Sequence, residues 1–223
     1  MTNKKAPDIV EVHALAVQTF ELHIIGDTPL IVHAWSDKAK RMMLEKQQKK
    51  ATKAKEIRRP AVEFADSLYW LTEKPMLDDL TDEQAQEVLN RVIPRSKFGF
   101  PVTAFKAAAL DAGFQQGLLA PKAGTAQLAR TTARGAFHIL GEFAVIEGTP
   151  TIREDMTRIG MGTADLRYRA EFRAWETTLT IKFNASAVSI EQIVNLFNVA
   201  GFANGVGEWR PSKDGSYGTF HVA

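Results

Sequence analysis

The stretch Asp165-Leu-Arg-Tyr-Arg-Ala-Glu-Phe-Arg-Ala-Trp175-Glu-Thr-Thr-Leu-Thr-Ile-Lys-Phe183 shows most clearly how this chain folds. Apolar side chains occupy the even positions from Leu166 to Phe172 and alternate with charged residues. A period of two is typical of a strand with one buried face. From Leu179 to Phe183 the apolar side chains occupy odd positions instead. A straight strand cannot keep one face buried through that change, so we expect a bulge or a short break near residues 174–177.

The strands and helices predicted on both sides of this stretch follow the element order of a known fold. The expected elements, in chain order, are a strand at 19–34, a helix at 101–112, a strand at 136–146, the strand at 166–183, a helix at 189–200 and a strand at 217–222. This order predicts an α+β, ferredoxin-like (RNA-recognition-motif-like) β-α-β-β-α-β core. In that core two helices cover one face of a four-stranded antiparallel sheet.

The rest of the chain is assigned around this core. We expect a single domain over 1–223, because no linker and no internal repeat divides the sequence. A long insertion, residues 35–98, follows the first strand and is predicted to be basic and helical. Residues 120–135 and 147–165 are predicted to be loops, since Gly, Pro and Thr interrupt any apolar period there.

Composition excludes several classes of protein. The chain of 223 residues has no cysteine, which rules out disulfide frameworks, thiolate zinc sites and cysteine nucleophiles. No apolar run approaches the 18 residues of a membrane span, so no membrane association is predicted. Asp8 and Glu11 lie where a signal peptide needs apolar residues. These features predict a cytoplasmic protein, and no cofactor or metal is expected.

The net charge of +2 conceals a strongly basic segment. Between Asp37 and Arg59 there are ten Lys or Arg residues and three acidic ones, so this segment carries +7 and the remainder −5. A polyanion responds to local charge within a Debye length rather than to the average. The segment is therefore a candidate arm for binding nucleic-acid phosphates.

Two further features strengthen this interpretation. Arg167, Arg169 and Arg173 lie at odd positions of one strand, so we expect them on one face, with Trp175 nearby to stack on bases. In the Gly-rich segment, residues 201–218, we expect Gly205 and Gly207 to let backbone N–H groups approach phosphate. The predicted nucleic-acid-binding residues are Lys38, Lys40, Arg41, Lys46, Lys49, Lys50, Lys53, Lys55, Arg58, Arg59, Arg130, Arg134, Arg167, Arg169, Arg173, Trp175, Gly205, Gly207, Trp209, Arg210 and Tyr217.

Catalytic signals are weaker. No two of the five histidines lie within four residues of each other, so the sequence has no metal-binding histidine pair. His33 is the best candidate for a general base, and Asp37 and Asp66 are the acidic residues to test. No catalytic residue is assigned, and we do not expect an enzyme.

The Gly-rich segment carries a family resemblance. Together with the order of elements, Arg210, Gly215, Tyr217 and Gly218 resemble the glycine-rich loop of the RAMP superfamily, and residues 98–106 look like that family's Pro-led entry into its first helix. These repeat-associated proteins build the RNA-binding backbone of CRISPR effector complexes. The chain is also similar to small phage-encoded proteins that pair a Thr-Pro-Leu-Ile-Val-His strand, here residues 28–33, with a Gly-x-Gly-Glu-Trp-Arg-Pro ending.

The resemblance implies a binding function. We expect a protein that binds single-stranded nucleic acid without sequence preference, favours RNA, and coats the strand as a filament or homo-oligomer. Three alternatives remain: a single-stranded DNA-binding protein of phage replication or recombination, a ribonuclease, and a protein that mimics a CRISPR subunit and binds other proteins. A phage origin would place it in the cytoplasm of the host cell.

Overall fold

The computed structural model describes residues 14–35, 37–48, 58–119, 130–159 and 163–223. Its central sheet has the order β10-β1-β9-β5, with β1 at Val17–Gly26, β5 at Phe137–Ile139, β9 at Glu176–Asn184 and β10 at Phe220–Val222. All three neighbouring pairs are antiparallel. Helix α4 (Val102–Gln115) comes between β1 and β5 in the chain, and helix α6 (Ile190–Ala203) comes between β9 and β10. This is the ferredoxin-like arrangement, so the predicted fold class is confirmed.

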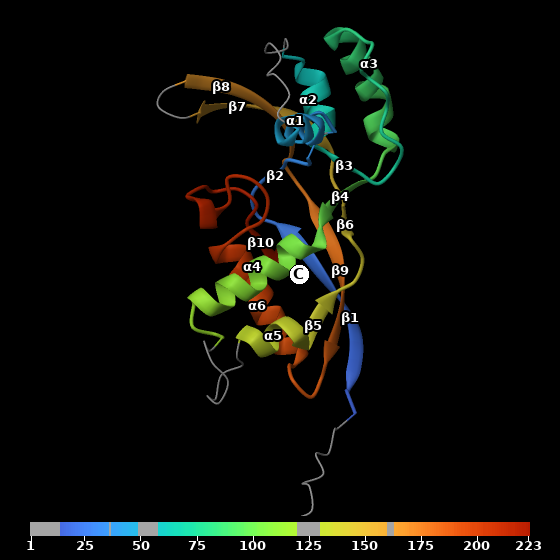
Figure 1. Cartoon of the computed structure of the whole chain (residues 1–223). Coiled ribbons are helices and arrows are strands. Elements are labelled where there is room, and N and C mark those ends of the chain that lie inside the picture. Colours follow the sequence, from blue (N-terminus) through green and yellow to red (C-terminus); the bar gives the residue numbers. More distant parts are fainter. Residues whose placement is uncertain (1–13, 36, 49–57, 120–129, 160–162) are drawn as a thin grey trace, which may run out of the picture.

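Two helices cover one face of this sheet (Figure 1). They are α4 (Val102–Gln115) and α6 (Ile190–Ala203), and both bury apolar residues in the core that also contains Leu22, Ile24 and Ile181 of the sheet. At the start of α6, the Ser189 side chain accepts a hydrogen bond from the backbone of Gln192, and the Gln192 side chain returns one to Ser189. This capping box fixes the start of the helix as the sequence predicts.

Each of the three long strands expected from the sequence divides in two. Residues 19–34 form β1 and β2 (Leu30–Val32), residues 136–146 form β5 and β6 (Phe143–Ile146), and residues 166–183 form β8 (Thr163–Phe172) and β9. One half of each leaves the central sheet: β2, β6 and β8 belong to other sheets. Strand β2 pairs with β8, while β6 pairs with β4 (Phe98–Pro101). The expected break near 174–177 is therefore real, and it separates two sheets.

A tryptophan joins two of these breaks. The Trp175 indole N–H donates to the carbonyl oxygen of Thr28 at 2.9 Å, and the Gly26 amide donates to the Trp175 carbonyl at the same distance. Gly26 is required here, because a Cβ at that position would lie 2.1 Å from the indole nitrogen. The breaks after β1 and after β8 are thus held against each other in the core.

Residues 147–165 were expected to form a loop, and this prediction is wrong. Residues Pro150–Ile159 form β7, which pairs with β8 over its whole length and makes an antiparallel hairpin. Figure 1 shows this hairpin extending away from the central sheet. The sequence pattern missed β7 because one of its faces carries Arg153, Asp155 and Thr157, which are stabilised by ion pairs and hydrogen bonds rather than by apolar burial.

The loop expected at 120–135 is also wrong in the part that the structure describes. Residues Arg130–Ala136 form the short helix α5 immediately before β5. Ala133 and Ala136, three residues apart and so on one side of the helix, are buried in the core and form its inner face. Residues 120–129 lie outside the described ranges.

The insertion at 35–98 contains several helices. They are α1 (Asp37–Gln47), α2 (Pro60–Ser67), α3 (Asp82–Val92) and the 3-10 turn η1 (Ile93–Arg95), with the short strand β3 (Tyr69–Trp70) pairing with β4. Helix α2 is fixed to the hairpin by Ser67, whose hydroxyl accepts from the Ala170 amide and donates to the Phe64 carbonyl. Strand β3 of the insertion places the Tyr69 ring against Phe100 of β4.

Candidate nucleic-acid interface

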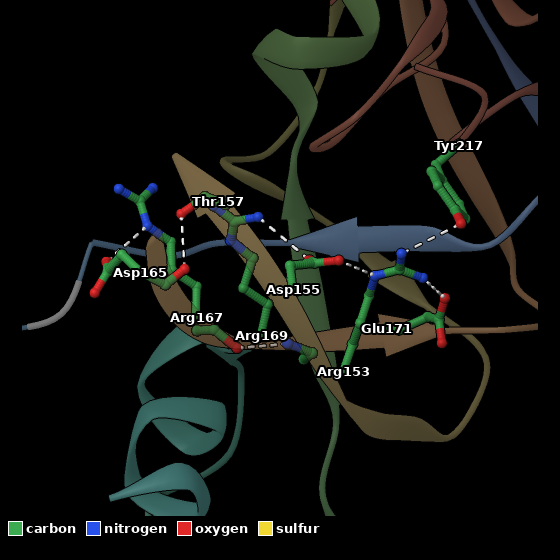
Figure 2. Close-up of polar contacts among 10 residues, drawn as sticks. Arg153, Asp155, Thr157, Asp165, Arg167, Arg169, Glu171 and Tyr217 are labelled. Atoms are coloured by element: carbon green, nitrogen blue, oxygen red, sulfur yellow. Dashed lines mark hydrogen bonds and ion pairs between the residues drawn. The ribbon is translucent and has the colours of Figure 1, made fainter. Parts of the chain in front are cut away.

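Arginines and acidic residues of the β7–β8 hairpin form a ladder of ion pairs (Figure 2). Arg169 is only 4% exposed and pairs with Asp155 at 3.4 Å, while Arg153 on β7 contacts Asp155 and Glu171 at 2.8 Å. Arg167 lies 3.6 Å from Asp165, and Arg173 lies 3.5 Å from Glu171. The expected exposed row of cations is therefore wrong for Arg169, because acidic side chains beside it neutralise the arginines and bury it.

Arg153 extends the ladder to the Gly-rich segment. Its guanidinium lies over the Tyr217 ring at 4.6 Å and donates to the Tyr217 hydroxyl at 3.2 Å. Burial disfavours the Arg153 cation, but hydrogen bonds to Tyr217, Asp155 and Glu171 outweigh it and raise the pKa of Arg153. One face of the Tyr217 ring is thus occupied by a cation, which leaves less of this ring for stacking on a base than the sequence suggests.

Two arginines from the end of the basic segment also have structural roles. Arg58 pairs with Glu63 at 2.9 Å and with Asp165 at 2.5 Å. Arg59 donates to the carbonyl oxygens of Leu77, Asp78 and Leu80 and so fastens the segment before α3 to the start of α2. Both guanidinium groups are held by the protein itself, so neither is a ready phosphate ligand.

The structure describes the remaining lysines and arginines of the predicted interface only in part. Lys40 and Arg41 are exposed on α1. Lys38 and Lys46 belong to α1 and Arg130 begins α5, although the structure does not describe their side chains. Lys49, Lys50, Lys53 and Lys55 lie outside the described residues. Arg134 is exposed on α5, at a distance in sequence from the arm.

Trp175 was expected to stack on bases, and this prediction is wrong. The side chain is 4% exposed and packs against the Phe105 and Phe220 rings at 6.5 and 6.2 Å between centroids. Its indole N–H is used by Thr28. The parity change in the sequence marked this residue correctly as a break but gave no sign that the ring turns inward.

The glycines of the Gly-rich segment pack backbone against backbone. Gly205 and Gly207 have φ of +61° and +81°, and a Cβ on Gly207 would lie 2.5 Å from the Ile31 carbonyl oxygen. The Gly205 amide donates to Ala200, so the phosphate-binding role expected for it is wrong. The neighbouring amide of Glu208 donates to Ile31. These glycines allow the turn to pack closely against β2.

The same turn presents one ring and one guanidinium at the surface. Trp209 has φ of +53° and is 41% exposed. Arg210 donates to the Gly207 carbonyl at 2.7 Å and to the Ser212 hydroxyl at 3.1 Å. These two bonds use two of the five N–H groups of a guanidinium and fix its orientation. The Trp209 ring is thus exposed, and the neighbouring Arg210 is half-buried with its guanidinium oriented by the turn itself.

A pocket of about 230 Å³ opens between this turn and α4. Its floor is made by Ala104, Ala107 and Ala108 of α4, and its polar wall includes His33, Asn204, Glu208 and Arg210. The rings of Tyr69 and Phe100 line it as well and pack edge to face at 6.0 Å. We call this cavity the turn pocket. Sequence reasoning missed Tyr69, Asn204 and Glu208 as members of a site.

The electrostatics of the turn pocket keep His33 neutral. Desolvation of its ring beside the pocket and the positive charge of Arg169 lower the pKa of His33 below its ordinary value, and Glu208 opposes them. Desolvation and the Glu208 carboxylate raise the pKa of the Tyr69 hydroxyl. The pocket therefore presents an uncharged imidazole, an uncharged phenol and a carboxylate near neutral pH.

The open face of the central sheet differs from that of an aromatic RNA-binding sheet. On the four described strands β1, β5, β9 and β10, no Phe, Tyr or Trp is exposed on the face away from the helices. That face carries His23, His138, His221 and Lys182 instead. Base stacking needs exposed rings, so this face is a poor platform and the turn pocket is the better candidate.

The catalytic candidates are dispersed. Asp66 pairs with Lys74 at 2.5 Å, Asp37 begins α1 without a described side chain, and only His33 lines the turn pocket. Within the described ranges, no three His, Asp or Glu side chains converge as a metal site. Among the helices in those same ranges, none combines the length and the apolar character needed to cross a membrane.

Comparisons with known proteins find similarity among solved structures only. No family model matches the chain. No curated protein matches it either. Among solved structures, the chain is similar to Cmr6 from Pyrococcus furiosus with a TM-score of 0.33 and 9% identity, over 94% of this chain and 100% of the other. At this score the two agree only loosely, and the fold assignment above rests on the strand order of the central sheet.

Proposed function

We propose that this chain binds single-stranded nucleic acid, favours RNA, and coats the strand as a homo-oligomer without reading most of its sequence. The observation that carries the proposal is the exposed Trp209 ring, which is adjacent in the chain to Arg210, a residue that lines the turn pocket. An exposed ring stacks on any base, and an adjacent guanidinium contacts the backbone, so the pair suits a strand of arbitrary sequence. The relation to the RAMP superfamily is part of this proposal and rests on the sequence of the Gly-rich segment.

The arm adds a separate electrostatic contribution. Its lysines would neutralise phosphates and release counterions, so the logarithm of the affinity is expected to fall linearly with the logarithm of salt concentration. Charge reversal at Lys49, Lys50, Lys53 and Lys55 would flatten that dependence. Because the β8 arginines are paired within the ladder, their replacement would change the salt dependence much less.

The test is a titration of fluorescent RNA and DNA oligonucleotides of matched sequence over a range of salt concentrations. Trp209→Ala is expected to weaken binding by about 1–3 kcal/mol through the loss of one stacked base. Phe202→Ala is the control, because Phe202 is an 85% exposed ring that lines a different hollow with Leu118. Equal losses in both variants, or no binding at low salt, would contradict the proposal, and tighter DNA binding would identify the DNA alternative.

A further inference from the structure

The turn pocket has the size and lining of a site for one flat ring system. Its volume of about 230 Å³ is below the range of sites for drug-sized molecules, so it holds one heterocycle and excludes a dinucleotide. The alanines of α4 give it a smooth apolar floor, and Tyr69 and Phe100 give it aromatic walls. Such a slot matches the faces of a nucleobase better than a phosphate group, which needs converging cations.

The charges of the residues that line the pocket also favour a nucleobase over a phosphate group. Glu208 and Asp111 contribute two carboxylates to the pocket, while Arg210 contributes one cation and His33 is neutral. A phosphate in this cavity would meet more negative than positive charge. A neutral base would meet acceptors and donors that its edge can pair with.

Two acceptor groups in the pocket wall, the Glu208 carboxylate and the Asn204 side-chain oxygen, have no hydrogen-bond donor within the described part of the chain. The Glu208 carboxylate makes no hydrogen bond or ion pair there, although it lies close enough to raise the pKa of both Tyr69 and His33. Asn204 is 5% exposed, and its side-chain nitrogen donates to the Ala108 carbonyl, while its Oδ1 atom has no hydrogen-bond partner among the same residues. A half-buried carboxylate without a donor is costly to keep, so this wall is suited to a ligand that brings N–H groups.

We propose that the turn pocket receives one unstacked base of the bound strand and selects guanine, with Glu208 as the residue that reads it. This proposal rests on the proposed function and adds a base preference at one position. Guanine carries two adjacent N–H donors, at N1 and N2, that pair with the two oxygens of one carboxylate. Its O6 acceptor is matched by the remaining N–H groups of Arg210. Adenine, cytosine and uracil lack that pair of adjacent donors.

The experiment compares three RNAs of about 12 nucleotides, all uridine or with one central guanosine or adenosine. For the wild-type protein, the guanosine RNA is expected to bind about five- to 150-fold more tightly than the adenosine RNA, as one bidentate base contact predicts. Glu208→Gln would abolish this preference, since its amide offers one acceptor and one donor and matches adenine instead. Glu21→Gln makes the same charge change on the exposed sheet face and would leave the preference intact.

Guanosine 5′-monophosphate, titrated calorimetrically into the wild type and Glu208→Gln, separates the two proposals. RNAs that bind equally whatever the central base would overturn the guanine pocket and leave the proposed function standing. Binding of the mononucleotide that depends on Glu208, with no binding of any RNA, would support the pocket and overturn the proposed function. Absence of both kinds of binding would overturn both.

Discussion

Replacing Arg169 with methionine tests whether the β8 arginines hold the hairpin together or bind a ligand. The methionine fills most of the same volume but leaves Asp155 with one cation fewer. Breaking a buried ion pair costs about 3–5 kcal/mol. Asp155 keeps Arg153 at 2.8 Å, and its contact with Arg169 is long at 3.4 Å, so the loss is expected below that range. A hydrogen bond to a charged group contributes about 1.5–3 kcal/mol, and we expect a loss of about 2 kcal/mol.

Urea unfolding followed by circular dichroism measures this difference. A loss of about 2 kcal/mol corresponds to a fall of about 4–8 °C in melting temperature for a chain of this length. Arg173→Met is the matched control, because the Arg173 side chain is 76% exposed and its contact with Glu171 is a surface pair worth about 0–1 kcal/mol. If Arg169→Met unfolds within about 0.5 kcal/mol of the wild type, or if Arg173→Met costs as much, the ladder is not the structural element that we describe.

Two further predictions concern the Gly-rich segment and the turn pocket. Gly218→Ala is expected to lower the free energy of unfolding by about 3 kcal/mol, because φ is +67° and the new Cβ would lie 1.8 Å from the Val206 carbonyl oxygen; Gly135→Ala, where a Cβ meets nothing within 4 Å, should cost nothing in the same urea titration. His33 has a lowered pKa in the folded state, so the unfolded chain binds more protons and the stability from this group is lost as the pH falls through the folded pKa. His33→Gln should therefore reduce the rise in unfolding free energy between about pH 5 and pH 7.5, and an unchanged rise would show that His33 is not its source.

The core of the fold was predictable because its elements carry local signals. The parity change between Leu166 and Phe183 located the break, and the Ser189 capping box located the start of α6. The β-α-β-β-α-β order of the predicted elements then indicated the ferredoxin-like fold. The β7–β8 hairpin was not predictable in this way, since its polar face is stabilised by ion pairs between residues of the two strands. A period of apolar residues carries no information about such a pairing.

The same limit applies to the site. The arginines of β8 were correctly placed on one face, but the neutralising Asp155 lies on a strand that the pattern did not reveal. The turn pocket joins Tyr69 from the insertion to Glu208 from the Gly-rich segment, and only the tertiary fold brings residues so distant in sequence together. The binding roles of Trp209 and Arg210 stay predictions from the sequence, and the structure adds that the Trp209 ring is exposed and that Arg210 lines the turn pocket.

The contact between Trp175 and Thr28 determines how the molecule carries mechanical load. Strands β1 and β2, like β8 and β9, are continuous in sequence and pass from one sheet to another, and the indole ties both crossings together. A force applied to the hairpin would therefore be transmitted into the buried core rather than absorbed by bending at a joint. A molecule that pulls on the hairpin would have to break this contact before the two sheets could separate.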